Sequence, residues 1–119
     1  MDHATSLSIA RIVAGAAAWV APRTSLKLVL LDAEAPQSPY LLRMFGVRDV
    51  ALGAVTLMSP EAVRPALLKV GLAVDSADSA AALLALRAKQ VRPAAGVVLA
   101  GVAAAGVAAS VQALGQQAD

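Results

Sequence analysis

The chain has 119 residues, of which 59% are hydrophobic and 15% are charged, against about 25% charged residues in an average soluble domain. This length allows one domain, covering residues 1–119. The formal net charge of +2 is too small to indicate a nucleic-acid-binding surface, and the absence of cysteine excludes disulfides and thiolate metal sites. Alanine, leucine and valine dominate the sequence, which favours an all-α fold.

The first hydrophobic segment covers residues 5–21, is interrupted only by Arg11, and ends just before Pro22. Because the opening Met1-Asp2-His3 supplies no basic stretch, we expect this segment to remain as a helix and not to be cleaved as a signal peptide. Residues 23–38 follow and are too short and too polar to cross a membrane. They are expected to lie at the membrane surface as an interfacial amphipathic segment.

The second and third hydrophobic segments cover residues 39–59 and 61–90. Each is preceded by a Ser-Pro pair, Ser38-Pro39 and Ser59-Pro60, which is typical of a helix start with serine at the N-cap and proline in the first turn. Because Ser59-Pro60 leaves almost no loop, we expect the second and third helices to form a tight antiparallel hairpin.

The fourth segment, residues 93–115, is the most apolar, since no charge occurs between Pro93 and Ala118. A membrane span needs about 20 such residues to cross a hydrocarbon core of about 30 Å. A buried helix of a soluble bundle would show a polar stripe, which is absent here before Gln112. The four segments together predict an integral membrane four-helix bundle with antiparallel, up-and-down topology.

Orientation follows from the cations in the short connections, because such residues concentrate on the cytoplasmic side. The first and third connections carry five cations, while the opposite side carries only Arg64 and Lys69. The sequence therefore predicts a multi-pass protein of the plasma (inner) membrane with both termini outside the cytoplasm, and with Trp19 and Tyr40 as anchors at the cytoplasmic interface. The five cations are Arg23, Lys27, Arg87, Lys89 and Arg92.

Several ionisable residues interrupt the predicted spans, and such residues are costly in a membrane unless they pair inside the bundle. Asp75 and Asp78 lie three residues apart and share one helix face. We expect Arg48 to pair with one of these aspartates and Arg11 to lie near Asp49. This charge cluster could be a set of interhelical clamps, or it could work as a proton relay or as a site for an anionic lipid headgroup. Its members are Arg11, Arg48, Asp49, Asp75 and Asp78.

Small residues on the fourth segment are expected to allow close helix packing, namely Gly101, Ala105, Gly106 and Ala109. No catalytic, cofactor-binding or metal-binding motif is apparent. The one histidine, His3, has no second ligand at a suitable spacing, and Asp75 and Asp78 alone provide too few oxygen ligands for a cation. The sequence therefore predicts a protein that is not an enzyme and that needs no cofactor.

The segment Arg43-Met44-Phe45-Gly46-Val47-Arg48-Asp49-Val50-Ala51-Leu52-Gly53 resembles a family of small actinobacterial four-helix membrane proteins with an FGxRDxxLG helix. In size and helix count the chain is also similar to accessory subunits of the mycobacterial MCE lipid-import complex, of the lipid uptake coordinator type. The resemblance implies a non-catalytic subunit that docks in the lipid bilayer beside the permease subunits of a transporter, with no nucleic-acid partner. The alternative is a small oligomeric transporter, or a lipid- or proton-binding carrier, that uses the charge cluster.

Overall fold

The computed structural model describes residues 2–33, 35 and 37–118, and in this part of the chain all regular structure is helical. The helices are α1 (His3–Val20), α2 (Pro22–Leu28), α3 (Ser38–Met58), α4 (Arg64–Arg87) and α5 (Pro93–Ala118). The all-α prediction is confirmed. The expected interfacial segment contains the short helix α2, which turns away from α1 by 117° at Pro22.

The helix starts differ from the prediction. Gln37 is the N-cap of α3, so Ser38 already lies within the helix, and α4 begins at Arg64 instead of near Glu61. Pro65 explains the late start of α4. A helix that began at Pro60 would place Pro65 in its interior, where proline removes a backbone hydrogen bond and collides with the preceding turn. Residues 60–63 form a turn instead, in which the amide of Val63 donates to the carbonyl of Pro60 at 3.0 Å.

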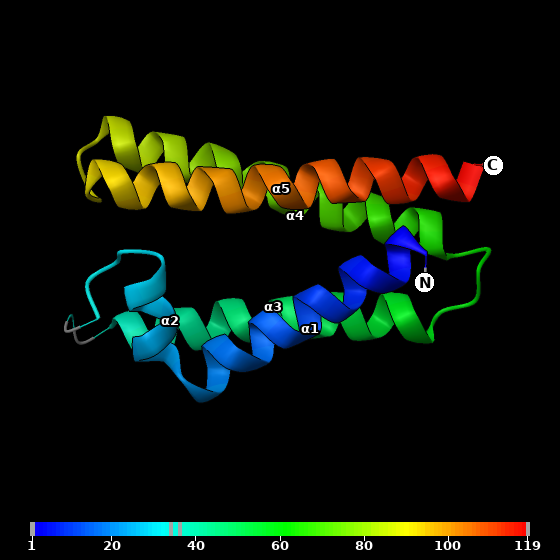
Figure 1. Ribbon diagram of the computed structural model, residues 1–119, viewed down its shortest axis with the longest axis horizontal. Coiled ribbons are helices and arrows are strands. Elements are labelled where there is room, and N and C mark those ends of the chain that lie inside the picture. The colour runs from blue at the N-terminus through cyan, green and yellow to red at the C-terminus, as the bar shows by residue number, and fades with distance from the viewer. Residues whose placement is uncertain (1, 34, 36, 119) are drawn as a thin grey trace.

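The four long helices are arranged as two hairpins that lie side by side, α1 with α3 and α4 with α5 (Figure 1). The chain runs up and down through them, and both termini lie at the same end of the molecule (Figure 1). The prediction of a tight hairpin between the second and third spans is wrong, because α3 packs far more extensively on α1 than on α4. Residues 59–63 instead cross from one hairpin to the other.

Glycine allows α1 and α3 to approach one another closely. A Cβ atom built at Gly53 would lie 2.5 Å from the backbone oxygen of Ser8, and one at Gly46 would lie 2.5 Å from the backbone oxygen of Gly15. A methyl group at either position would force the two backbones apart. The contact between α1 and α3 is therefore a close backbone packing and not an interdigitation of large side chains.

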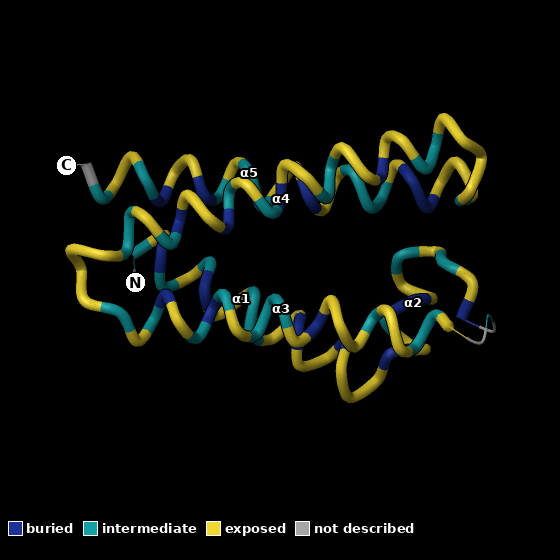
Figure 2. Tube along the Cα trace, turned by 180° about the vertical axis from the view of Figure 1, so that it is seen from behind, coloured by how far each residue is buried: buried dark blue, intermediate teal, exposed yellow. Residues whose placement is uncertain are grey.

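Burial is inverted relative to a soluble helical bundle. Among the described residues, seven alanines, Leu26, Leu68 and Pro22 are buried, and the largest fully buried side chains are those of Ser8 and Ser110. Large apolar side chains instead lie exposed on the outer faces, among them Val13, Leu41, Val55, Leu84 and Val102. Figure 2 shows exposed residues along the full length of every long helix.

By length and apolar composition, residues Pro93–Gln117 of α5 form the one helix of the described chain that could cross a membrane on its own. Helices α1 and α2 meet the same criterion only when they are taken together across their bend. Helices α3 and α4 contain too many charged residues to meet this criterion.

Candidate functional site

The centre of the molecule holds a bidentate ion pair between α1 and α4. The guanidinium of Arg11 donates through Nη2 to Oδ2 of Asp75 at 2.6 Å and through Nη1 to Oδ1 at 3.2 Å. Both side chains are deeply buried, with 10% of Arg11 and 9% of Asp75 exposed. Two parallel charge-assisted hydrogen bonds are the strongest arrangement that these groups can form.

Two glycines make room for this ion pair. A Cβ built at Gly71 of α4 would lie 2.9 Å from Nη2 of Arg11, and one at Gly106 of α5 would lie 2.5 Å from Oδ2 of Asp75. The uncharged helix α5 therefore closes the site by presenting bare backbone to the carboxylate. Gly106 is the predicted packing residue that lies at this contact.

A second ion pair joins α3 to α4. Nη2 of Arg48 donates to Oδ2 of Asp78 at 2.7 Å, and the same guanidinium lies 4.5 Å from the centre of the Phe45 ring. This pair is more open than the first, with 40% of the Arg48 side chain and 28% of the Asp78 side chain exposed. Of the two partners expected for Arg48, the structure places Asp78 beside it.

Asp49 is the third carboxylate of the cluster. Its Oδ1 lies 3.8 Å from Nη1 of Arg11, close enough for an ion pair but longer than a hydrogen bond, and 13% of its side chain is exposed. Arg11 is thus near Asp49, as expected, but its closest partner is Asp75. The five members of the cluster carry three carboxylates and two guanidiniums, which leaves one negative charge in excess if all are ionised.

These ion pairs join the two hairpins, because both guanidiniums come from the α1–α3 hairpin and Asp75 and Asp78 come from α4. An apolar contact near the termini joins the hairpins as well, where Ala4 packs with Leu68 and Ala113. The charge cluster therefore lies at the interface between the two halves of the fold.

Two of the other small residues named on α5 do not face this interface. Gly101 and Ala105 are exposed, and a Cβ at Gly101 would meet nothing within 4 Å. Ala109 is half-buried, whereas Ser110 is fully buried. Gly101, Ala105 and Ala109 recur at every fourth residue and so follow one side of the helix, about 40° apart from one to the next, because consecutive helical residues are about 100° apart.

The residues that pack α1 on α3 were not singled out from the sequence. Ser8 and Gly15 are seven residues apart on α1, and Gly46 and Gly53 are seven apart on α3. Small residues at a spacing of about two helical turns lie on one face, so this repeat was a usable signal.

Among the described residues, no group of three histidine, aspartate or glutamate side chains is placed to hold a metal ion. The contact that the structure gives His3 is made by its backbone amide, which donates a hydrogen bond to Oε1 of Gln116 at 2.7 Å. This bond joins the start of α1 to the end of α5. Comparison of the chain with models of protein families, with curated proteins and with solved structures found no match.

Proposed function

We propose that this chain is a multi-pass protein of the plasma membrane in which α1, α3, α4 and α5 all cross the bilayer. The inverted burial carries this proposal. Water-soluble proteins bury large apolar residues and rarely expose extended apolar surfaces, whereas here valines and leucines cover the outside and charges lie within. The hydrocarbon core of a membrane suits this arrangement, because lipid tails solvate the apolar outer faces while the ion pairs lie inside the bundle, away from lipid.

The dimensions of the molecule support the proposal. Its longest axis measures 44 Å, close to the roughly 40–45 Å of a bilayer with its headgroup regions. The 26 residues of α5 extend for about 39 Å at about 1.5 Å per residue. Charges in α1, α3 and α4 are compatible with membrane spans because the central ones are paired with one another.

Within the membrane, the proposed role is that of a non-catalytic accessory subunit of a larger complex, with an MCE-type lipid importer as the partner implied by the sequence resemblance. The described helices are joined by short connections, so most of the surface available for a partner is the apolar lateral surface. Small residues on that surface, such as Gly101 and Ala105 on α5, favour close contact with the helices of a larger membrane protein.

Two measurements test these proposals in sequence. Alkaline carbonate washing of cell membranes should leave the chain in the pellet, and its appearance in the supernatant would refute the membrane assignment. Affinity purification of the tagged chain in a mild detergent should then recover larger membrane proteins at fixed stoichiometry. Recovery of a lone homo-oligomer would refute the subunit role.

A carrier is the second candidate, and the excess carboxylate favours it. The nearest guanidinium nitrogen of Arg11 lies 3.8 Å from Asp49 but 2.6 Å from Asp75, and a proton could neutralise the remaining negative charge. For a proton-coupled carrier, Asp49→Asn should abolish proton-driven uptake in reconstituted vesicles while the protein remains folded. Unchanged complex recovery with this variant would be the result expected of an accessory subunit.

A further inference from the structure

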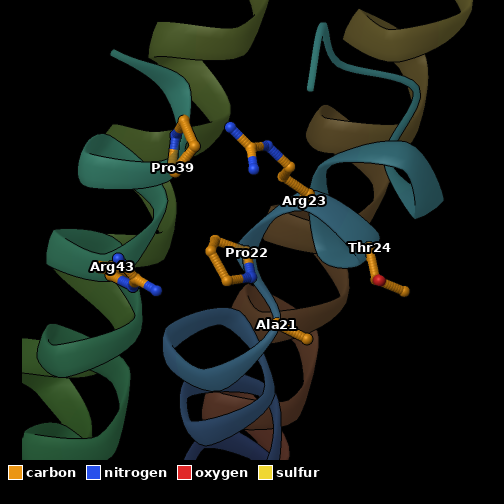
Figure 3. Close-up of a pocket in the computed structure, with 6 residues that line it drawn as sticks. All are labelled: Ala21, Pro22, Arg23, Thr24, Pro39 and Arg43. Atoms are coloured by element: carbon orange, nitrogen blue, oxygen red, sulfur yellow. The ribbon is translucent and has the colours of Figure 1, made fainter. Parts of the chain in front are cut away.

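A small basic pocket lies where α1 turns into α2, at the end of the molecule opposite the termini (Figure 3). Arg23 extends from the first turn of α2 towards Pro39, and Arg43 extends from α3 towards Pro22 (Figure 3). The pocket has a volume of about 330 Å³ and is lined by Ala21, Pro22, Arg23, Thr24, Pro39 and Arg43.

Arg43 is held in position by Trp19. Its Nε donates to the backbone oxygen of Trp19 at 3.0 Å, and its guanidinium lies 5.5 Å from the centre of the indole ring. One of its donors is thus used within the protein, and the Nη groups form no hydrogen bond with a described residue. Neither Arg43 nor Arg23 takes part in an ion pair with another described residue.

Two prolines line the pocket beside the arginines. Pro22 and Pro39 fix the backbone on its two sides, since the proline ring locks φ near −65°. The pocket thus presents two guanidiniums, and the N–H groups of arginine bind the oxygens of a phosphate in bidentate fashion. A neutral or cationic ligand would supply no counter-charge to these two arginines.

The surroundings of the pocket match the level of lipid headgroups. Trp19 contacts Arg43, and Tyr40 follows Pro39 in the chain. Both aromatic side chains are exposed, and such residues are enriched at the membrane–water interface. Helix α2 leaves the direction of α1 by 117°, as expected of a helix that lies along a membrane surface. Basic pockets between membrane helices at this depth suit anionic headgroups.

We infer that this pocket binds the phosphate of an anionic glycerophospholipid, with Arg23 and Arg43 as the two ligating side chains. The inference rests on the proposed membrane location but not on the role of the chain as a subunit. Phosphatidylglycerol should be preferred over phosphatidylcholine, because the choline ammonium cancels the phosphate charge and is repelled by the arginines.

The chain itself carries a reporter for this test, since Trp19 is its one tryptophan and contacts Arg43. The purified full chain in non-ionic detergent is titrated with short-chain phosphatidylglycerol, with phosphatidylcholine of the same chain length, and with inorganic phosphate. We expect the Trp19 emission to shift saturably with phosphatidylglycerol, at a concentration at least about fivefold below that needed for phosphatidylcholine. The preference should weaken with added salt.

Arg23→Gln is the diagnostic variant, because Arg23 lines the pocket whereas Arg43 is the arginine that contacts Trp19. It should raise the half-saturating concentration of phosphatidylglycerol about fivefold, the factor expected from the loss of one cation near an anionic surface, and leave that of phosphatidylcholine unchanged. Lys27→Gln is the matched control, since Lys27 is an exposed cation of the same helix that does not line the pocket. Its half-saturating concentrations should match those of the wild type.

Three outcomes would overturn the inference. These are equal responses to the two lipids, equal effects of Arg23→Gln and Lys27→Gln, or an equally strong response to inorganic phosphate, which would identify free phosphate as the ligand. Because carbonate washing tests the membrane location separately, a chain that stays in the membrane but fails this titration refutes only the lipid site.

Discussion

At the scale of single residues, the central fact is that Arg11 has almost no access to solvent and is neutralised by Asp75. Removing two charges from water is expensive, and a close bidentate geometry offsets that cost only while both partners are present. Arg48 and Asp78 are partly exposed, and Arg48 also lies over the Phe45 ring. The two ion pairs should therefore differ strongly in their contribution to stability.

The variant Asp75→Asn should destabilise the protein by about 3–5 kcal/mol, because it leaves a buried guanidinium without its counter-charge. Asp78→Asn removes the same charge one turn further along α4 and should cost much less, since its pair is more exposed. Unfolding by increasing sodium dodecyl sulfate in mixed micelles, followed by circular dichroism, measures both. Equal losses would contradict a dominant role for the Arg11–Asp75 pair.

Gly101 and Gly106 of α5 provide a second prediction. Gly106→Ala should destabilise the protein, because its Cβ would collide with the carboxylate of Asp75, which Arg11 holds in place. Overpacking of this kind costs about 1–3 kcal/mol. Gly101→Ala meets open space and should be neutral or stabilise by up to about 1 kcal/mol through helix propensity. The same unfolding measurement distinguishes them, and a harmless Gly106→Ala would show that α5 does not close the site.

At the scale of elements, the helices are defined by their ends more than by amphipathic patterns. Proline lies in the first turn of α2, α3 and α4, and Asp2 caps α1 by accepting a hydrogen bond from the amide of Thr5 at 2.7 Å. The outer faces are as apolar as the inner ones, so hydrophobic periodicity does not indicate which face is buried. In α1 and α3, small residues spaced seven residues apart indicate the buried face.

The cap of α1 predicts a dependence on pH. The hydrogen bonds from Thr5 lower the pKa of the Asp2 carboxyl below its ordinary value of 3.8. Because the pKa is lower in the folded state, the cap contributes its full stabilisation above pH 3.8, and this is lost as the pH falls through the lower, folded value.

Nuclear magnetic resonance can follow the Thr5 amide as the pH is lowered. Its chemical shift should titrate with a midpoint below 3.8, and Asp2→Asn should abolish the titration while it retains a capping oxygen. A midpoint at or above 3.8 would contradict the cap.

At the scale of the whole molecule, two hairpins meet across a charged interface, and both termini lie at one end (Figure 1). The connections at the opposite end carry most of the cations outside the spans. If the helices cross the membrane, these two ends lie on opposite sides of it, with the cation-rich end in the cytoplasm.

Single cysteines can test this orientation, because the chain has none of its own. In intact cells a membrane-impermeant maleimide should label Glu61→Cys and Gln116→Cys. It should label Gln90→Cys and Leu28→Cys only after the membrane is opened. Labelling of the second pair alone in intact cells would invert the topology, and labelling of all four would contradict a membrane-spanning bundle.

Much of this architecture follows from the sequence alone. The composition and the long apolar segments determine that the chain is helical and place its four long helices to within a few residues, except where Pro65 delays the start of α4. The charges within the predicted spans also limit the possible ion pairs to a few combinations. Asp75 and Asp78, one turn apart, were both candidates for Arg48, and local sequence contains nothing that distinguishes them.

Tertiary structure decided which helices pair and which carboxylate meets which guanidinium. Helical periodicity places residues on faces, but the rotation and depth of one helix against another depend on how closely their backbones can approach. Here Gly46 and Gly53 bring α3 onto α1, while Gly71 and Gly106 leave space for the Arg11–Asp75 pair. Asp49 is consequently left at a longer distance, a result that becomes apparent only when three helices are assembled around Arg11.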